Sequence, residues 1–599
     1  MALLVQKFGG TSVADSTKIL AAARRAIAAH ERGEKVLVVV SARGHTTDEL
    51  IGLAKEIHQR PPAREMDMLL STGEQVSVAL MAMAIHALGV PAISFTGAQI
   101  GIVTDSFHTK ARIRNISTER IRQALDEGKI VIVAGFQGVD EDYNITTLGR
   151  GGSDTTAVAL AAVLGADACE IYTDVDGVYT TDPRVVPEAR KIDRISFDEM
   201  LELASLGAGV MHSRSIEFAK KYGVPIHVRG ASSPAEGSWI IAEGDARRLG
   251  VRVTGAALAR DEARITVRGV PDRPGVVRRI FGAIASANIV VDMIVQNVAT
   301  AGVTEVSFTV ASDDLEQTLV VAEEASRAVG AHGVSHDAAV AKVSVVGLGM
   351  RTHTGVAREM FDALSEAGVN IQMITTSEIK ISVLVDRPSA ALALQVVHRA
   401  FRLDRPVEDA PSIAPRSSDW SATRASRRKP ATTNGSPTTA PPPGMEDLVI
   451  SGVELDEGQA RVTLHEVPDR PGYAAAVFRK IAEVDVFVDM IVQNISTAGN
   501  THVSFTVPRH ETQRAAKAAA DVGLGGVSVE PAIAKLSVLG VGMRTHTGVA
   551  ARMFAALAEG GINIALINTS EVRINVATDH DRGQEALEYL RKTFDLPAE

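Results

Sequence analysis

The sequence contains a single cysteine, Cys169, among its 599 residues. One thiol can form neither a disulfide within the chain nor a cysteine-based metal cluster, so the fold must be stabilised without them. This cysteine usage is typical of a protein that works in a reducing compartment. We therefore expect a cytoplasmic protein.

An excess of basic residues is also lacking, because 72 Asp and Glu outnumber 62 Lys and Arg and the net charge is −10 at pH 7. Nucleic acids and anionic membranes bind through clustered Lys and Arg. The composition therefore predicts no nucleic acid as a main partner and favours small metabolites. The opening MALLVQKFGG does not look like a signal peptide, and no uncharged apolar run approaches the ~20 residues of a membrane span, so no membrane partner is expected.

Short apolar stretches alternate with helical patterns up to about residue 250. LLVQKF, KVLVVVSA, KIVIVAGF and CEIYTDV are the apolar stretches, and helical patterns cover 16–30, 48–57 and 155–164. This alternation predicts an α/β fold with an open, mostly parallel sheet and helices on both faces. The chain is long enough for roughly four domains of ~150 residues, and the first is expected to span 1–250.

From about residue 262 the pattern changes to the βαββαβ order of a ferredoxin-like unit. We expect four such units: unit 1 at 262–335, unit 2 at 340–405, unit 3 at 446–530 and unit 4 at 533–599. In unit 1, helices are predicted over 276–287 and 315–329, with a strand over IVVDMIVQNV (289–298) between them. The segment 406–445 is rich in Pro, Ser, Thr and Arg and is expected to be a disordered linker.

Units 3 and 4 repeat the motifs of units 1 and 2. DMIVQN occurs at 292–297 and again at 489–494, with VPDRPG before each copy, and GLGMRTHTGVA (347–357) returns as GVGMRTHTGVA (540–550). Several separated identities in the same order indicate duplication of a two-unit module.

Two glycine-rich turns follow predicted strands and precede predicted helices. In KFGGTS (7–12), the glycines let backbone N–H groups approach an anion and Lys7 adds a positive charge. LGRGGSDTTA (148–157) has the same context. Either turn alone would more often be structural, and KFGGTS is not a Walker A motif because its lysine precedes the glycines. Together with SARGHTTDE (41–49) and STGE (71–74), they predict a ligand site at the strand ends, where open α/β sheets bind ligands.

A further stretch, YTDVDGVYTTDPR (172–184), ends a predicted strand with acidic residues and a proline turn. Such a stretch could bind a ribose and place Arg184 on phosphates. An ordinary Asp-Gly hairpin is the alternative interpretation.

In this order, KFGGTS, SARGHTTDE, LLSTGE, TTLGRGGSDTTA and TDVDGVYTTDPR resemble the amino acid kinase family, and within it the aspartate kinases. The four units resemble ACT domains, the amino-acid-sensing modules that follow the kinase domain. The resemblance covers nearly all of the chain except 406–445. It implies ATP-dependent phosphorylation of the L-aspartate β-carboxylate to 4-phospho-L-aspartate, at the entry to lysine, threonine and methionine synthesis.

The resemblance also implies roles for single residues. Lys7 and Asp154 would be catalytic, with Asp154 organising the phosphate and Mg²⁺ region. Glu74 would bind the substrate ammonium and Arg150 a carboxylate; the full implied substrate set is Ser41, Thr47, Glu74, Arg150, Gly151, Gly152 and Ser153. The implied nucleotide set is Lys7, Phe8, Gly9, Gly10, Thr173, Asp174, Tyr179 and Arg184.

The chemistry of phosphoryl transfer agrees with this set. A β-carboxylate with a pKa of ~3.9 is ionised at neutral pH, so the reaction needs no catalytic base. Cationic groups, backbone N–H donors and Mg²⁺ must instead stabilise the charge of the transition state. Because Mg²⁺ keeps several waters and binds phosphate oxygens, we expect no cage of protein metal ligands.

Two segments depart from the family pattern. Gly209, in GAGVMHSRS (207–215), stands where many relatives have a lysine. HVRGASS (227–233) stands where the family usually has an RSS stretch followed by an aromatic residue. Both bear on nucleotide affinity rather than on the aspartate pocket. His212, at the start of a predicted helix, is expected to make a structural hydrogen bond rather than to act as a base.

The duplicated module is expected to bind an amino-acid effector. Each PDRPG turn opens a helix, whose free N–H groups and dipole suit a carboxylate, and each DMIVQN adds polar side chains. In the resembling ACT domains the NI segment of the paired unit completes the site. The candidate effector ligands are Asp272, Gly275, Gln296, Asn297, Asn370, Ile371, Asp469, Gly472, Gln493, Asn494, Asn563 and Ile564.

Alternatives remain open at this point. The sequence leaves open whether lysine, threonine or both inhibit, and whether the second module binds a ligand or only dimerises. The copies differ at Thr375 and Asn568, which would let them sense different ligands. ACT sheets usually pair across subunits, which predicts a homodimer or a larger homo-oligomer. The rival functions are an amino acid kinase with another substrate, such as glutamate or a nucleoside monophosphate, and a catalytically weak amino-acid sensor.

Overall fold

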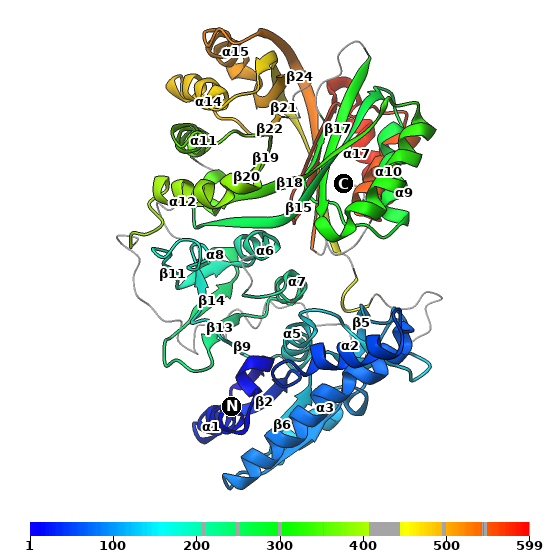
Figure 1. The fold of residues 1–599 in the computed structure, drawn as a ribbon, viewed down its shortest axis with the longest axis vertical. Coiled ribbons are helices and arrows are strands. Elements are labelled where there is room, and N and C mark those ends of the chain that lie inside the picture. Colours follow the sequence, from blue (N-terminus) through cyan, green and yellow to red (C-terminus); the bar gives the residue numbers. More distant parts are fainter. Residues whose placement is uncertain are drawn as a thin grey trace.

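The computed structural model describes residues 1–206, 210–246, 252–296, 302–351, 353–406, 444–447, 449–493, 499–541, 543 and 548–597. It has two parts, which lie one below the other in Figure 1. Residues up to 246 form the lower, α/β part, and the later residues form an upper part built on long strands.

An eight-stranded sheet is the centre of the α/β part, in the order β12-β14-β13-β9-β1-β2-β6-β3. All neighbours are parallel except β13 and β14. The strands are β1 (Leu3–Phe8), β2 (Lys35–Val40), β3 (Ala92–Phe95), β6 (Ile130–Ala134), β9 (Ala168–Thr173), β12 (Arg194–Ser196), β13 (Ile226–Gly230) and β14 (Ser238–Ile241). Strands such as KVLVVV are almost purely apolar because both faces of the sheet are covered. The predicted fold class is confirmed.

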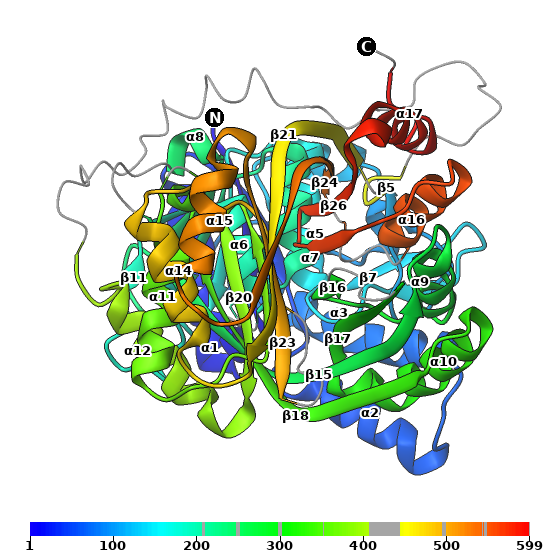
Figure 2. The same ribbon diagram turned by 90° about the horizontal axis from the view of Figure 1, so that it is seen from above.

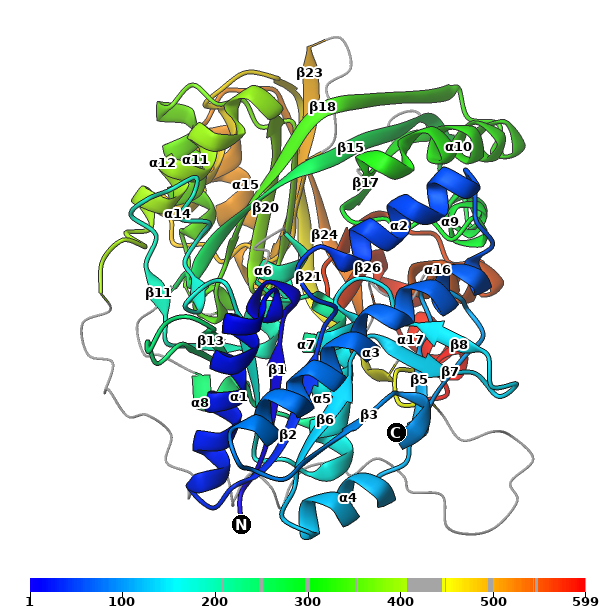
Figure 3. The same cartoon turned by 60° about the horizontal axis from the view of Figure 1, so that its bottom comes forward.

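Helices cover the two faces of this sheet. Val36, Val38 and Val40 of β2 are buried with α1 and α3, which lie side by side in Figure 3. Leu37 and Val39 point the other way and are buried with the helices of the second face. The helices are α1 (Ser16–Glu31), α2 (Thr46–Ile57), α3 (Ala63–Ala87), α4 (Glu119–Asp126), α5 (Gly152–Leu164), α6 (Phe197–Ser205), α7 (Ser213–Tyr222) and α8 (Glu243–Ala246). A small sheet beside them contains β5 (Ile113–Ile116), β4 (Ile102–Thr104), β7 (Gln137–Val139) and β8 (Ile145–Thr147).

Among the described residues, α3 alone is long and apolar enough to span a membrane by length and composition. It is a core helix of the α/β part, because 56% of its apolar window is buried inside the structure.

The upper part is a closed ring of twelve strands in the order β15-β17-β16-β25-β26-β24-β21-β23-β22-β19-β20-β18. The strands of the first module are β15 (Gly255–Pro271), β16 (Ile294–Gln296), β17 (Val303–Ala311), β18 (Gly333–Val346), β19 (Met373–Ser377) and β20 (Lys380–Asp386). Those of the second are β21 (Val449–Pro468), β22 (Ile491–Gln493), β23 (Asn500–Pro508), β24 (Gly526–Val541), β25 (Leu566–Thr569) and β26 (Arg573–Asp579). Apolar side chains such as Met293, Met373 and Met490 form a buried cluster drawn from both modules.

Helices lie on the outside of this ring in two groups, which Figure 2 shows on opposite sides of the strands. One group belongs to units 1 and 4 and the other to units 2 and 3. Units 1 and 4 contain α9 (Val276–Ser286), α10 (Leu315–Val329), α16 (Val549–Glu559) and α17 (Gly583–Thr593). Units 2 and 3 contain α11 (Val356–Glu366), α12 (Ala390–Ala400), α14 (Tyr473–Glu483) and α15 (Thr512–Ala520).

The units pair across the two modules as well as through the long strands within each module. Strand β16 of unit 1 pairs with β25 of unit 4, and β19 of unit 2 pairs with β22 of unit 3. Phe281 contacts Phe554 at a ring distance of 5.6 Å, and Phe361 contacts Phe478 at 5.3 Å. The sheet pairing that the sequence analysis expected between subunits is therefore made within one chain.

Several boundaries differ from the predictions. The long strands β15 and β18 each run from one unit of a module into the next. Residues 255–259 of β15 pair with 342–346 of β18, and 262–268 of β15 lie between 333–340 of β18 and strand β17. Within the described residues, the predicted strand over 289–298 pairs regularly only at Ile294–Gln296. Asp292 and Met293 share Thr309 as their backbone partner, which breaks the regular register, and Ile289 is buried among the helices. Helix α5 begins at Gly152, earlier than predicted, because Gly151 caps it at a φ of 72°. Gly444 and Met445, at the end of the segment expected to be a linker, lie against the α/β part.

Candidate functional site

Lys7 and Asp154 meet at the carboxyl end of the central strands. Lys7 lies near the end of β1, and Asp154 lies in the first turn of α5. Lys7 Nζ is 2.6 Å from Asp154 Oδ1, and the two side chains are only 11% and 12% exposed. Charges shielded from water interact more strongly than exposed ones. The ammonium of Lys7 is therefore held in one place at a point where it can attract an anion.

The first glycine-rich turn packs tightly on a neighbouring turn. A Cβ on Gly10 would lie 2.7 Å from the Ala42 carbonyl oxygen, so no larger residue fits there without a shift of the backbone. The Gly44 N–H donates to the Gly10 carbonyl at 3.0 Å. KFGGTS and SARGHTTDE, which are separate in the sequence, are thus brought together. Gly9 leaves the space beside Lys7 Nζ open, since its Cβ would lie 3.5 Å from that atom.

The second glycine-rich turn is equally constrained. Gly151 has a left-handed φ of 72°, and a Cβ there would lie 2.3 Å from the Cβ of His212. Ser153 is buried, whereas Arg150 is exposed and reaches toward solvent. His212 caps α7 and accepts the Arg214 N–H at 3.4 Å. The predicted structural role of His212 is confirmed.

Glu74 lies in α3 with a side chain that is almost fully buried. One carboxyl oxygen accepts the Ala42 N–H at 3.0 Å, and the other has no hydrogen-bond partner within the described residues. Burial raises the pKa of Glu74 to about 7, although the Ala42 N–H acts in the opposite direction. A buried carboxyl with one unused oxygen is well suited to bind an ammonium group.

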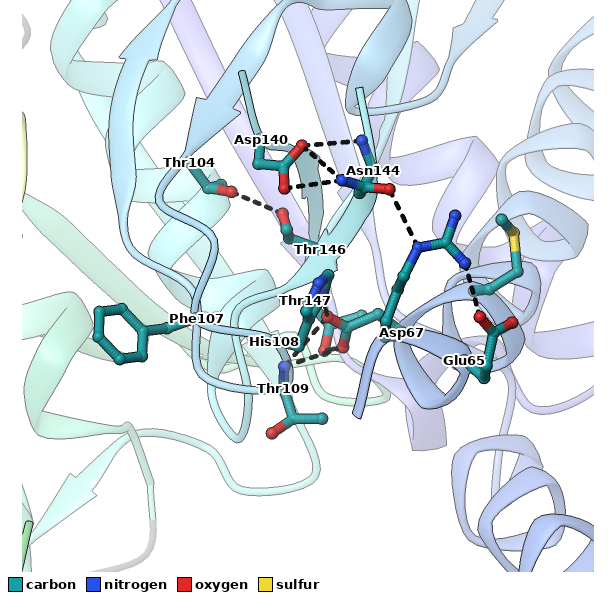
Figure 4. A network of polar contacts seen from close by, with 12 residues as sticks. Glu65, Asp67, Thr104, Phe107, His108, Thr109, Asp140, Asn144, Thr146 and Thr147 are labelled. Carbon is teal, nitrogen blue, oxygen red and sulfur yellow. Dashed lines mark hydrogen bonds and ion pairs between the residues drawn. The ribbon is translucent and has the colours of Figure 1, made fainter. Parts of the chain in front are cut away.

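Asp67, one of the residues that the sequence analysis missed, connects this site to the small sheet (Figure 4). Its buried carboxylate lies 2.7 Å from His108 Nδ1 and accepts the Thr109 N–H at 3.0 Å and the Thr147 hydroxyl at 2.5 Å. Thr147 ends β8 and immediately precedes the turn that begins at Leu148. Asp67 therefore fixes that turn to the helix that carries Glu74. A lone acidic residue in the apolar stretch of α3 was the available signal.

A second carboxylate stiffens the same sheet. Asp140 accepts the N–H groups of Asp142 and Asn144 and the Asn144 side-chain amide, which closes the turn between β7 and β8 (Figure 4). Phe107 points away from this network in the same view and is 75% exposed.

The candidate nucleotide residues begin where β9 ends. The Gly9 N–H donates to the Tyr172 carbonyl at 3.3 Å, so the first glycine-rich turn lies next to Thr173. The Thr173 hydroxyl donates to Asp174 at 3.0 Å. Arg184 is farther out: its side chain is 85% exposed and binds Asp182 at 2.8 Å, which raises the pKa of Arg184. Arg184 is thus bound to a neighbouring carboxylate rather than turned to the glycine turns.

Some residues that the sequence analysis named lie outside the part of the chain that the structure describes. Gly209 lies outside the described residues, as do the candidate effector ligands Asn297 and Asn494. In the described stretch HVRGASS, a Cβ on Gly230 would lie 2.2 Å from Asp176 Oδ1, so this departure keeps a close approach that needs glycine.

The candidate effector residues meet in two matching clusters. In the unit 1–unit 4 pair, Asn563 Nδ2 donates to Asp272 at 2.8 Å and Gln296 Nε2 donates to the Ile564 carbonyl at 2.7 Å. In the unit 2–unit 3 pair, Asn370 donates to Asp469 at 2.9 Å and Gln493 to the Ile371 carbonyl at 3.1 Å. Each PDRPG turn therefore meets an NI segment of the other module.

Two cavities lie at the opposite ends of the same pairs. The larger, about 320 Å³, lies between α11 and α14 and is lined by Thr354, Gly355, Asp489 and Lys535 among others. The smaller, about 70 Å³, lies between α9 and α16 and is lined by Asp292, Gly548 and Thr569. The sequence analysis did not predict a cavity at either position. The available signal was the sequence THTG, which occurs in both modules. Gly355 and Gly548 open helices with φ of 86° and 100°, as Gly275 and Gly472 do with 87° and 95°.

Helix α6 is one of the elements through which the α/β part contacts the ring, together with the stretch around Thr180. Glu202 is fully buried and lies 2.7 Å from Lys380 Nζ of unit 2, and it also accepts the Glu571 N–H of unit 4 at 3.3 Å. Glu199 accepts from the Thr254 hydroxyl at 2.6 Å and from the Leu348 N–H at 3.1 Å. One helix of the α/β part therefore contacts both unit pairs.

Family models match both parts of the chain. The amino acid kinase family model matches residues 2–230, and ACT domain models match 263–330, 343–401, 465–522 and 536–594. Taken with the sheet, the glycine-rich turns and the Lys7–Asp154 pair, these matches define an amino acid kinase that carries four ACT domains.

Similar proteins narrow this class. An aspartate kinase of Pseudomonas putida is 53% identical over 406 residues, which are 68% of this chain and 99% of that protein. A crystal structure of aspartate kinase from Synechocystis is 39% identical, with a TM-score of 0.51 and full coverage of both chains. E. coli aspartokinase III is 27% identical in two structures: a complex with aspartate and ADP (R-state; TM-score 0.58, covering 66% of this chain and 99% of that one), and one with lysine and aspartate (T-state; 0.52, 67% and 99%). The chain belongs to the aspartate kinase family.

Proposed function

We propose that the protein transfers the γ-phosphoryl group of ATP to the β-carboxylate of L-aspartate and forms 4-phospho-L-aspartate. The observation that carries this proposal is the buried Glu74, whose unused oxygen and pKa near 7 suit an α-ammonium group. Arg150, on the turn that Asp67 anchors, would bind a substrate carboxylate. The E. coli structure with aspartate and ADP supports the same two ligands for this site.

The residues of the chain divide the work of phosphoryl transfer. Lys7, held by Asp154, would neutralise charge on the transferring phosphoryl group, and the open space at Gly9 lets phosphate oxygens approach backbone N–H groups. Asp154 and the nucleotide phosphates would hold Mg²⁺, which supplies further charge neutralisation when bound. Thr173, Asp174 and Tyr179 would line the nucleotide pocket. The ionised β-carboxylate then attacks without help from a base.

The product would feed lysine, threonine and methionine synthesis, as the family resemblance implies. The enzyme would work in the cytoplasm. A homodimer or a larger homo-oligomer also remains our proposal. Because the ring makes the ACT pairing within one chain, subunits would associate through other surfaces. Light scattering that shows a strict monomer at micromolar concentration would count against it.

A hydroxamate assay tests the reaction directly. Hydroxylamine traps the acyl phosphate, and we expect product with aspartate and Mg-ATP and none when aspartate is replaced by glutamate. For a nucleoside monophosphate, whose product is not an acyl phosphate, the measurement is ADP release, and we expect none. Product formed from glutamate alone would identify another amino acid kinase. A folded protein that forms no product with any substrate would disprove the proposed reaction.

We further propose that lysine, threonine or both inhibit the enzyme by binding at the unit 1–unit 4 and unit 2–unit 3 pairs. Support comes from the two clusters around Asp272 and Asp469, from the cavities at the THTG turns, and from the E. coli structure with lysine. An effector that binds one arrangement of a pair more tightly than another shifts the equilibrium between them. Contacts of both pairs with α6 offer a route to the active site.

Matched variants of the two clusters separate their roles. Asp272→Ala and Asp469→Ala remove the same acceptor from the same turn in different unit pairs. Because a hydrogen bond to a charged group contributes about 1.5–3 kcal/mol, we expect each change to raise the half-inhibitory concentration of one effector about tenfold or more. Inhibition by lysine and threonine, singly and together, is the measurement. Unchanged inhibition in both variants would exclude these clusters as effector sites.

A further inference from the structure

Residues 444–447, which lead into the second module, bind to the α/β part rather than to the ring. The Met445 side chain is 5% exposed and belongs to the hydrophobic core of the α/β part. The N–H groups of Met445 and Glu446 donate to the carbonyls of Arg114 and Ile113 at 3.1 and 3.2 Å, along strand β5. The Tyr222 hydroxyl of α7 donates to the Met445 carbonyl at 2.9 Å. The segment is thus anchored between β5 and α7.

Glu446 reaches the substrate turn through Arg214 of α7. Its carboxylate, in a side chain 6% exposed, accepts from Arg214 Nε at 3.0 Å and from Nη2 at 2.5 Å. The same guanidinium donates to the Leu148 carbonyl at 2.5 Å and to the Ala111 carbonyl at 2.6 Å. Leu148 begins the glycine-rich turn that carries Arg150. The five N–H donors of a guanidinium have a fixed planar geometry. The contacts of Arg214 with Glu446 and Ala111 therefore also fix the donor that binds the Leu148 carbonyl.

The buried ion pair therefore joins a residue after the linker to the mouth of the substrate site. Arg214 also follows His212, whose Cβ occupies the space that a side chain at Gly151 would need. The turn is thus held at its start by Arg214 and near its end by His212. Glu446 lies outside residues 2–230, which the amino acid kinase family model matches, and outside the ACT matches, so the contact comes from a segment between the two modules.

We propose that Glu446 is a positioning residue for aspartate binding: it orients Arg214, and Arg214 holds the Leu148 carbonyl so that Arg150 faces the substrate. The second module is then part of the substrate site as well as a candidate sensor. This inference rests on the proposed role of the Arg150 turn in binding aspartate.

Glu446→Gln, which keeps the shape of the side chain and removes its charge, tests the inference. The matched control is Asp447→Asn, because Asp447 is the next residue and pairs with Arg114 at 3.3 Å on a partly exposed surface. Asp447 also accepts the Gly444 N–H at 2.6 Å, and the amide oxygen of Asn can still accept that bond. We expect Glu446→Gln to raise the KM for aspartate about tenfold and to leave the KM for ATP unchanged, since small displacements of a positioning group have large effects on rate and binding. Asp447→Asn should leave both constants within twofold.

Two further measurements identify the route. Arg214→Lys should raise the KM for aspartate by a similar factor, and the double variant should be no worse than either single one, because residues that act through one contact are not additive. Amide exchange over 148–152 in the free enzyme should quicken in Glu446→Gln and not in Asp447→Asn. If amide exchange changed as expected but the wild-type enzyme did not use aspartate, only the proposed function would be disproved. If folded Glu446→Gln kept the wild-type KM for aspartate and the wild-type exchange rates, only the inference about Glu446 would be overturned.

Discussion

Lys7→Ala is expected to lower kcat about 100- to 1000-fold, the range seen when one preorganised donor is removed from a site of developing charge. The physical reason is the position of Lys7 Nζ, which a single ion pair with Asp154 holds at the carboxyl end of β1. Phosphoryl transfer here has no proton to move, so charge stabilisation and positioning account for nearly all of the catalysis. The measurement is the hydroxamate rate at saturating aspartate and Mg-ATP.

The control for this variant removes the same charge one strand away. Lys35 begins β2 and binds Asp126 on the surface, with its side chain 31% exposed. Surface ion pairs contribute little to stability, so Lys35→Ala should stay folded and keep the wild-type turnover. If Lys7→Ala also kept the wild-type rate, Lys7 would have no part in the mechanism.

Glu74→Gln should raise the KM for aspartate about 100-fold, because a buried charge that loses its partner costs several kcal/mol. Gln keeps the volume of the side chain and can still accept the Ala42 N–H. The wild-type enzyme should show the same dependence through pH. Burial raises the pKa of Glu74 to about 7, so kcat/KM for aspartate should fall as the pH drops below 7 and the carboxyl takes up a proton.

The Glu74 carboxyl group is expected to affect the stability of the fold in the opposite direction to its effect on aspartate binding. The folded pKa lies above the ordinary value of 4.5, so the contribution of Glu74 to stability is fully present below pH 4.5 and is lost as the pH rises through 7. A shift of this size corresponds to about 3 kcal/mol. Without aspartate, Glu74→Gln should therefore gain stability relative to the wild type between pH 5 and 8, measured by denaturant unfolding. Glu65→Gln, an exposed position on the same helix, should show no such trend.

An equal dependence on pH in Glu74→Gln and the wild type would contradict the assignment. It would mean that another group controls both aspartate binding and stability in this range. The paired result, weaker binding together with higher stability, is typical of a residue kept for function at a cost to the fold.

The α/β part was largely predictable from local patterns. LLVQKF was predicted as a strand and forms β1, and the helix predicted over 315–329 is α10 at Leu315–Val329. The glycine-rich turns also lie where the alternation of strands and helices placed them. Less accurate were segments whose conformation depends on a distant partner, such as 289–293, where Asp292 and Met293 share Thr309 as their backbone partner instead of extending the regular strand.

The crossed pairing of the units could not be read from the sequence. Four similar units carry the same apolar faces, so local patterns do not state which unit lies beside which. The contacts that decide it join residues far apart in the chain, such as Gln296 with Ile564 and Gln493 with Ile371. Asp67 and Glu446 were missed for the same reason, since their partners lie on other elements.

The sequence by itself determined the class of fold, the duplication, the glycine-rich turns and the residue types that phosphoryl transfer needs. These follow from periodicity and from the chemistry of neighbouring residues, which are local properties. Only the tertiary structure decided that the two modules close into one ring, that Glu74 is buried with one oxygen unpartnered among the described residues, and that Glu446 reaches the Leu148 turn through Arg214. Burial and long-range contacts depend on how the whole chain packs, because each side chain acquires its dielectric surroundings and its partners only in the folded state.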